Sequence, residues 1–426
     1  MMKYTTILLA VLMVAAVLAH DYAPGPKQTA PILLKDGTLY TISDGVKEGY
    51  DLLMVDGRIA EIAENIAPPD GAEVIDVTGR HVYPGLIAAG TNIGLVEIGA
   101  VRATVDTREV GRINPDVQSH TAYNPDSEII PTVRSNGIAY AEVVPGGSMV
   151  RGRSCLLNLD AWTKEDAAEK LVVGLHVSWP AVAVRTAWWE TRSPEEQKKA
   201  MAESRRRLKK AFDDAEAYAV AKAADPDIDI DSRWEAMLPV LSGELPLFVH
   251  AGDYRQIEQA VAFCTERDLR MILVGGGEAW KVTDLLTAHD TPVIYFDAHD
   301  IPMRSDDDYD QAFKIPRLLN EAGVKFCFGA GGSWTVRNLP FDAGQAVAFG
   351  LDKETALRAL TLTPAEILGT EENIGSLETG KKATVIVSDG DILDHLTHHV
   401  THMFIEGRVV NLDNKHKELY RKYQAR

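Results

Sequence analysis

The sequence predicts an α/β fold, in which a (β/α)8 barrel carries a small β domain built from both ends of the chain. Three observations predict this fold. The middle of the chain alternates apolar runs with segments of helical periodicity, as parallel β/α units do. Both ends contain short β patterns separated by turn residues. The chain has 426 residues and is 46% hydrophobic, which is enough for a large core or for two domains.

Residues 1–19 have the pattern of a cleaved export signal. Lys3 supplies a positive end, residues 7–18 are almost wholly apolar, and small residues precede His20. The apolar run is shorter than the roughly 20 residues of a membrane span, and no charged stop follows it. We therefore expect an exported, periplasmic mature chain without an integral membrane span. The alternative interpretation is a membrane anchor.

The two ends of the remaining chain predict β structure. Five segments carry the patterns: 32–40, 52–62, 74–77, 383–387 and 403–410. Asp56-Gly57 lies at the expected bend of a hairpin in the second of them. Because the patterns flank one long middle region, we expect a composite β domain of residues 31–84 and 374–412. Residues 413–426 then form a C-terminal tail.

The middle region, residues 85–373, predicts the barrel. Apolar runs typical of strands occur at 85–89, 138–144, 171–177, 245–249, 269–274, 292–296 and 324–328. Between the last four runs, helical patterns occur at 254–267, 278–289 and 309–322. Seven expected strands, with one not placed, suit an eight-stranded barrel better than an open sheet.

Two helix starts carry capping signals. Residues 193–196, Ser-Pro-Glu-Glu, predict a capping box that opens a long polar helix to about Ala224. Residues 363–366, Thr-Pro-Ala-Glu, predict a second box, with Gly369 closing its helix. The long helix carries a basic run at 205–210. Acidic residues interleave with this run, which favours a solvated helix face over a binding patch.

The net charge limits which partners are expected, and the number of cysteines limits which cysteine chemistry is expected. The formal net charge of −18 argues against nucleic acid and against anionic membrane surfaces as partners. The three cysteines are too few for a disulfide framework: Cys155, Cys264 and Cys327. Cys264 lies on the apolar face of an expected helix and Cys327 in an expected strand. Both are interpreted as small buried apolar groups.

Three runs together resemble the amidohydrolase superfamily, nearest to its imidazolonepropionase-like members. They are residues 77–87, 356–369 and 374–383, and the resemblance covers roughly residues 31–412. It implies a (β/α)8 barrel with a small β-sandwich formed by both termini. It also implies a parent activity, the hydrolysis of a non-peptide carbon–nitrogen bond in a cyclic or linear amide.

The resemblance implies a degenerate metal site. Such enzymes hold divalent metal at the C-terminal mouth of the barrel, where it acidifies water and polarises the scissile carbonyl. The five matching positions are Gly90, Asn92, His250, Gly275 and Gly331. Only His250 can ligate a metal well, and a catalytic zinc needs about three protein ligands. We therefore expect no metal cofactor, unless zinc or another divalent metal is held by a site rebuilt with Asp253, Asp297 or His299.

The same mouth predicts a binding site for a small polar or anionic molecule. Glycine leaves space and exposes backbone N–H groups, and residues 275–277 precede a helix expected near Glu278, whose N-terminus would attract anions. His250 is the candidate catalytic residue. The candidate binding residues are Asn92, His176, Asp253, Gly275, Gly331 and Trp334. The alternative is drift after the metal was lost, with His176 as a hydrogen-bonded core residue.

A second histidine cluster near the C-terminus is weighed separately. It contains His395, His398, His399 and His402, a density that can suit zinc. These residues fall between expected β strands of the composite domain, away from the barrel mouth. A solvated loop or strand is therefore favoured over a metal site.

Two classes of function remain open. The first is an exported hydrolase-family enzyme with a remodelled, metal-independent site around His250. The second is a non-catalytic relative that binds a ligand or supports an active paralogue as a partner chain. Homo-oligomerisation is compatible with either class.

Overall fold

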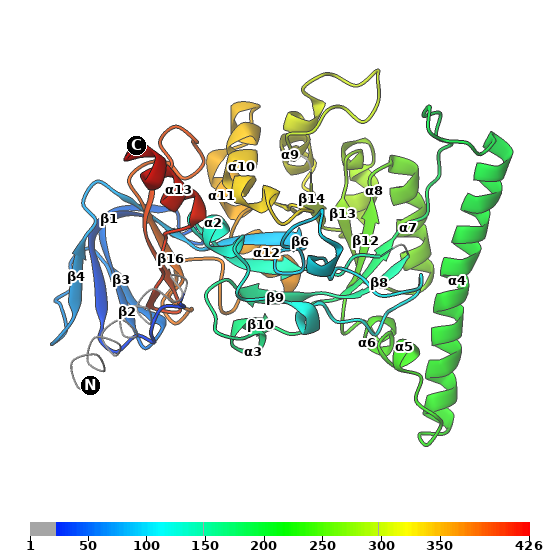
Figure 1. Cartoon of the computed structure of the whole chain (residues 1–426), viewed down its shortest axis with the longest axis horizontal. Helices are drawn as coiled ribbons and strands as arrows, with labels where there is room; N and C mark the ends of the chain where they lie inside the picture. The colour runs from blue at the N-terminus through cyan, green and yellow to red at the C-terminus, as the bar shows by residue number, and fades with distance from the viewer. Residues whose placement is uncertain (1–22, 148, 297) are drawn as a thin grey trace, which may run out of the picture.

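The computed structural model describes residues 23–147, 149–296 and 298–426. Residues 1–19, Ser148 and Asp297 therefore lie outside the described residues. The described chain forms three β-sheets with helices packed on them (Figure 1). Mixed α/β content is thus confirmed.

The largest sheet combines strands from both ends of the chain. Its order is β18-β17-β16-β5-β1-β2-β3, with β4 paired to β1. The strands are β1 Ile32–Tyr40, β2 Val46–Val55, β3 Arg58–Ala63, β4 Glu73–Asp76, β5 His81–Pro84, β16 Val385–Ser388, β17 Val400–Ile405 and β18 Arg408–Val409. The ends join where β5 pairs antiparallel with β16, for example Tyr83 with Ile386. Asp56 and Gly57 adopt positive φ at the hairpin bend, as predicted. Whether this sheet is a separate β-sandwich domain stays a prediction.

A six-stranded sheet places most of the site. Its order is β15-β14-β13-β12-β11-β8, and β11 to β15 run parallel. The strands are β8 Val150–Arg153, β11 Leu175–Ser178, β12 Leu247–Ala251, β13 Met271–Gly275, β14 Val293–Tyr295 and β15 Phe326–Phe328. The parallel strands β11 to β15 are short, mostly apolar and almost wholly buried, as expected for parallel strands covered on both faces. Their carboxyl ends share one edge, where ligands bind in such folds.

A four-stranded sheet adjoins both edges of the six-stranded sheet. Its strands are β6 Leu86–Thr91, β7 Ile138–Val143, β9 Cys155–Asn158 and β10 Ala168–Lys170, in the order β10-β9-β7-β6. Ala89 forms a parallel bridge with Gly329, just after β15. Ser154 alone separates β8 from β9. A barrel of eight parallel strands is not confirmed, because the strands divide between two sheets and β8 and β9 run antiparallel to β11 and β7.

The long predicted helix is confirmed as α4, Pro194–Ala224, at the edge of the molecule (Figure 1). Ser193 Oγ accepts from the Glu196 N–H, and the Glu196 carboxylate accepts from the Ser193 N–H, so the predicted capping box is present. The basic run is solvated, as predicted. Its lysines pair with acids one turn on, including Lys210 with Asp214 at 2.6 Å.

The other helices are shorter. They are α2 Ile130–Arg134, α3 Lys164–Ala167, α5 Ser232–Glu235, α6 Leu238–Leu241, α7 Tyr254–Glu266, α8 Thr283–Ala288, α9 Gln311–Glu321, α10 Leu339–Ala348, α11 Lys353–Arg358, α12 Leu362–Leu368 and α13 Lys415–Gln424. None of the described helices is both long and apolar enough to span a bilayer. All three cysteines are buried and free, as interpreted from the sequence for Cys264 and Cys327.

Two local predictions are wrong, and the C-terminal tail contains a helix on which no prediction was made. The second capping box is absent, because Thr363 lies inside α12 and its N-cap, Thr361, makes no capping side-chain bond. Gly369 does close that helix with left-handed φ. The helix expected over 278–289 is a 3₁₀ turn, Ala279–Lys281, followed by the short α8. The C-terminal tail contains α13, whose residues are all at least partly exposed.

Candidate functional site

Two histidines meet at the carboxyl edge of the parallel strands. His176 lies in β11 and His250 in β12, and Ser178 pairs with His250 in the register of these strands. His176 Nδ1 lies 2.9 Å from His250 Nε2. The His176 ring is fully buried and stacks on Phe248 at 4.5 Å between centroids. His176 is therefore a hydrogen-bonded core histidine, and it also reaches the candidate catalytic residue.

Glu142 completes a buried chain of polar groups. It lies in β7 and is fully buried. Its carboxyl oxygens accept from the Gly90 N–H at 3.0 Å and from Ser154 Oγ at 2.7 Å, and His176 Nε2 lies 3.2 Å from Oε1. Glu142 thus serves as an acceptor for three donors.

This chain fixes which ring nitrogens carry protons. His176 Nε2–H donates to Glu142, so His176 Nδ1 accepts, and His250 Nε2–H donates to it. His250 Nδ1 is then left as an acceptor, with no hydrogen bond to the residues that the structure describes. The His250 side chain keeps partial exposure. It therefore offers a lone pair to a ligand or to water.

Both imidazoles are neutral near pH 7. Burial lowers the pKa of His250 well below its usual value, and the Arg151 cation and His176 lower it further. Burial also lowers the pKa of His176, against the opposing effect of Glu142. His250 is therefore a hydrogen-bond acceptor rather than a cation.

Arg151 places a positive charge beside this pair. It lies in β8, which runs antiparallel to β11, so its first residues reach the edge where β11 ends. Its Nε donates to Ser178 Oγ at 2.8 Å. The side chain is mostly buried, and burial lowers its pKa to about 10, which still leaves it charged at neutral pH. No described carboxylate forms an ion pair with it.

The positions expected for metal ligands do not fit a metal. A Cβ at Gly90 would overlap the ring of Phe296, and one at Gly329 would lie 2.5 Å from it; a Cβ at Gly331 would contact the ring at 3.4 Å. The Phe296 side chain thus fills the space beside these glycines. No cluster of three or more His, Cys, Asp or Glu side chains is arranged to hold a metal ion within the described part of the chain. His250, the one matching imidazole, has its Nε2 engaged with His176.

The other predicted site residues are placed as follows. Asn92 follows β6, and its buried Oδ1 lacks a hydrogen-bond partner among the described residues. Asp253 caps α7 and pairs with Arg255 and Arg304, which lower its pKa, the Arg255 bond most. Its charge is therefore already compensated. Trp334 is 40% exposed and stacks on His416 of α13.

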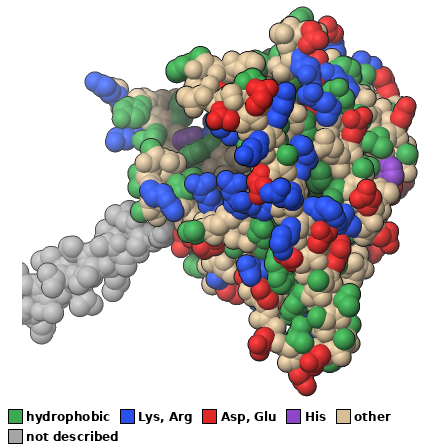
Figure 2. Space-filling view, turned by 90° about the vertical axis from the view of Figure 1, so that its right-hand side faces the viewer, with side chains coloured by type: hydrophobic (Ala, Val, Ile, Leu, Met, Phe, Trp, Pro, Cys, Tyr) green, Lys and Arg blue, Asp and Glu red, His purple; other side chains and the backbone are tan. Residues whose placement is uncertain are grey.

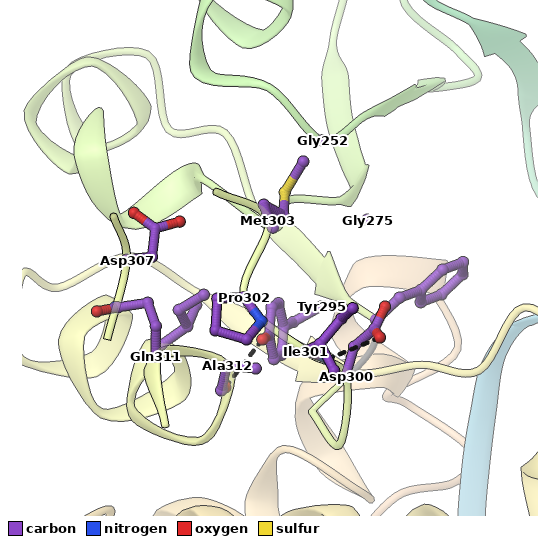
Figure 3. A pocket seen from close by; sticks show the side chains of 13 residues that line it. Gly252, Gly275, Tyr295, Asp300, Ile301, Pro302, Met303, Asp307, Gln311 and Ala312 are labelled. Atoms are coloured by element: carbon purple, nitrogen blue, oxygen red, sulfur yellow. Dashed lines mark hydrogen bonds between the residues drawn. The ribbon is translucent and has the colours of Figure 1, made fainter. Parts of the chain in front are cut away.

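Two neighbouring cavities share Asp300 in their linings. One, of about 200 Å³, is lined by Gly275, Phe296 and the segment around Met303, whose side chain lies near Gly252 (Figure 3). The other, of about 770 Å³, is lined by residues 298–300, by residues between 329 and 342 that include Gly331, and by His395. Gly275 and Gly331 therefore face different cavities. The expected helix N-terminus after Gly277 is a 3₁₀ turn, so it does not form the expected anion site.

The C-terminal histidines are not all away from the mouth, contrary to the expectation. His395 lines the larger cavity together with Gly331 and with His299, whose Nδ1 lies 2.5 Å from Asp342 Oδ1. His398 packs edge-on against Phe341 in the same wall. His399 is exposed and contacts Asp389, as expected of a solvated loop.

The fold and site define an α/β protein of the amidohydrolase type. The chain belongs to the Amidohydrolase family, whose sequence profile matches residues 157–410. It is 31% identical to a dihydropyrimidinase of Dictyostelium discoideum over 163 residues, which are 38% of this chain and 26% of that relative. It is 20% identical to the amidohydrolase tasK of Hapsidospora irregularis over 377 residues, 80% of this chain and 38% of the relative. These curated relatives are thus matched over well under half of their length.

Solved structures agree on the fold. An amidohydrolase from Thermotoga maritima MSB8 has a TM-score of 0.79 and 24% identity, over 89% of this chain and 99% of that chain. Molinate hydrolase has a TM-score of 0.55 and 17% identity, over 92% and 96%. At these identities the likeness concerns the fold alone.

Sequence reasoning missed three residues of the site. Glu142 is the one acid in the apolar run 138–144, and Arg151 lies in a short strand that the sequence analysis did not place. Phe296 follows directly after a correctly expected strand. A lone charge in a buried strand was the available signal for Glu142.

Proposed function

We propose that this amidohydrolase-family protein binds a small polar or anionic molecule beside His250 without a metal ion. The observation that carries the proposal is the pairing of a neutral His250, with Nδ1 free to accept, and a charged Arg151 without an acidic partner among the described residues. Around them, four of the five expected metal positions lack a good ligand, and Phe296 fills the space beside Gly90 and Gly331.

Three groups would contact the ligand. His250 Nδ1 accepts an N–H or O–H, Arg151 donates to an anion or a carbonyl, and Asn92 Oδ1 accepts a further donor. None of these contacts needs a metal. The set fits an amide-like molecule, which agrees with the parent activity that the family resemblance implies.

A second candidate is metal-independent hydrolysis of a carbon–nitrogen bond. The hydrogen-bonded series Glu142–His176–His250 favours it, because such a series orients His250 Nδ1 to take a proton from water. The lowered pKa of His250 makes it a weak base, which places binding ahead of catalysis.

One experiment separates these functions from the parent activity. The purified chain is analysed for metals and assayed for hydrolysis of dihydrouracil with and without a chelator. We expect well under one zinc per chain and no chelator-sensitive activity. Chelator-resistant hydrolysis that His250→Gln abolishes would establish the second candidate. Stoichiometric metal with chelator-sensitive turnover would overturn both.

We also propose that residues 1–19 are removed on export and that the mature chain is periplasmic. Support comes from Lys3, the apolar run and the small residues before His20. N-terminal sequencing of exported protein should begin near His20. Intact Met1 in the membrane fraction would contradict this. Self-association, or pairing with an active paralogue, is a further proposal that size-exclusion chromatography with light scattering tests.

The finer architecture is proposed as well. We propose that the four- and six-stranded sheets form one closed barrel with the composite sheet as a separate domain. The Ala89–Gly329 bridge supports closure on one side, and the near-continuous β8 and β9 support it on the other.

A further inference from the structure

The geometry points to an anion-binding subsite centred on Arg151, which takes a carboxylate or phosphate group of the ligand. The inference deepens the proposed function, on which it rests for placing the ligand beside His250. It names the chemical class of the ligand and assigns a residue to its recognition.

The hydrogen-bonding capacity of the Arg151 guanidinium is only partly used. This group has five N–H donors in a planar fork. Only Nε has a partner among the described residues, Ser178 Oγ at 2.8 Å. The two terminal nitrogens form no hydrogen bond or ion pair there. Their fork matches the two oxygens of a carboxylate or phosphate.

Two buried arginines elsewhere in the chain have acidic partners, whereas Arg151 has none among the described residues. A buried charge is costly unless an opposite charge accompanies it. The two most buried ion-paired arginines meet this requirement: Arg134, 3% exposed, contacts Asp160, and Arg267, 10% exposed, contacts Asp213. Arg151 is mostly buried and does not. A ligand anion would supply the missing charge.

Two further arginines lie near Gly147, which contacts Arg151. Gly147 packs against Arg151, since a Cβ there would lie 3.2 Å from the Arg151 Cα. Gly147 also lines a hollow of about 320 Å³ together with Arg102 and Arg108. Neither arginine forms an ion pair within the described ranges. In a chain of net charge −18, three such arginines concentrate positive potential locally.

The Arg151 fork and His250 Nδ1 form the two ends of the site, and they determine which chemical groups of a ligand can bind. An anionic group binds the Arg151 fork, and in a ligand that also carries an N–H or O–H, this second group donates to His250 Nδ1. Figure 2 shows a hollow on the face seen from the α4 side, with Lys and Arg side chains gathered along its lower edge. Attraction of an anion to such a face falls as salt rises.

The test is calorimetric titration of the full mature chain with succinate, inorganic phosphate and the neutral analogue succinamide. We expect at least one anion to bind and succinamide to bind at least tenfold more weakly. Arg151→Gln should weaken anion binding at least tenfold. Arg205→Gln, which removes an exposed charge from α4, should leave it within twofold. Binding of succinate alone, phosphate alone or both identifies the anionic group that the subsite takes.

Several results would overturn the inference. These are no binding of either anion, equal binding of succinamide, unchanged binding by Arg151→Gln, or an equal loss in Arg205→Gln. If Arg151→Gln does not fold, Arg151→Lys carries the test, because it keeps the charge but loses the fork. Metal content is measured on the same samples. Stoichiometric metal together with Arg151-dependent anion binding would overturn the proposed function and leave this subsite standing.

Discussion

At the scale of single residues, the chemistry of the site depends on which polar groups have hydrogen-bond partners and which do not. Glu142 satisfies three donors, so His176 and His250 have defined tautomers. Asn92 Oδ1 and the Arg151 fork lack such partners among the described residues. Buried polar groups are nearly always satisfied in folded proteins. The buried Asn92 Oδ1 therefore marks where a ligand or ordered water belongs, and the Arg151 fork adds unused donors beside it.

The lowered pKa of His250 predicts a pH dependence of stability. In the unfolded chain this histidine titrates near its ordinary pKa of about 6.5. In the folded chain its pKa lies well below that, so the unfolded state binds more protons between the two values. The free energy of unfolding should hence be constant above about pH 7 and fall as pH drops below 6.5. Urea unfolding from pH 8 to pH 5 measures it.

A pair of variants assigns this effect. His250→Gln should lessen the dependence below pH 6.5 without abolishing it, because burial also lowers the pKa of His176 and of four other histidines, whereas His289→Gln, at an exposed site, should leave it unchanged. An equal slope in wild type and His250→Gln would mean that other groups set the dependence.

At the scale of elements, strand positions were predictable and their ends were not. Apolar runs predicted β12 to β15 to within about two residues, because buried parallel strands need little besides apolar side chains. The helix expected from residue 278 failed for a tertiary reason. Glu278 is fully buried, accepts from the Tyr254 N–H, and pairs with Lys281 and Arg304. Its role is to fix neighbouring segments, which no local pattern reveals.

The candidate site was predictable only in part for the same reason. The matched motifs located His250 and the glycines, and His176 was noticed as the end of a strand. Glu142 becomes meaningful only through its contact with His176 in another sheet, and Arg151 only through its bond to Ser178 on a strand far along the chain. Phe296 could not be assigned a role, because its ring fills space that the sequence shows only as missing side chains.

Phe296 and Gly90 should therefore be energetically coupled. Gly90 has a φ of +80°, and a Cβ there would overlap the Phe296 ring. Gly90→Ala should cost the roughly 1–2 kcal/mol of left-handed φ plus the cost of displacing the ring. Gly71→Ala has a φ of +75° and nothing within 4 Å, so it measures the φ cost alone. Denaturant unfolding of both variants gives the difference.

The coupling itself comes from a double-mutant cycle. Phe296→Ala alone should destabilise the chain by about 3 kcal/mol through the lost aromatic contacts. In that background Gly90→Ala should cost no more than Gly71→Ala does. Additive effects of Gly90→Ala and Phe296→Ala would show that the ring does not fill this space.

At the scale of the whole molecule, strands from the two ends of the chain join in one sheet next to the start of the α/β region. β16 lies between β5 and β17, and the Gly85 N–H donates to the Thr384 carbonyl where the chain leaves the sheet. The strands from both ends share a core that includes Leu34, Met54 and Phe404. The composite organisation was predictable because β patterns occur at both ends. The α13 helix was not, since its short, highly charged sequence buries no residue.

This arrangement predicts opposite outcomes for two C-terminal truncations. Removing residues 415–426 deletes α13, which has no buried residue, and uncovers chiefly Trp334, so Tm should change by only a few degrees. Removing residues 383–426 also deletes β16 to β18 and exposes apolar side chains of β1 and β5, so cooperative unfolding should be lost. Differential scanning calorimetry compares the two. A cooperative transition in the longer truncation would show that the α/β region folds without the C-terminal strands.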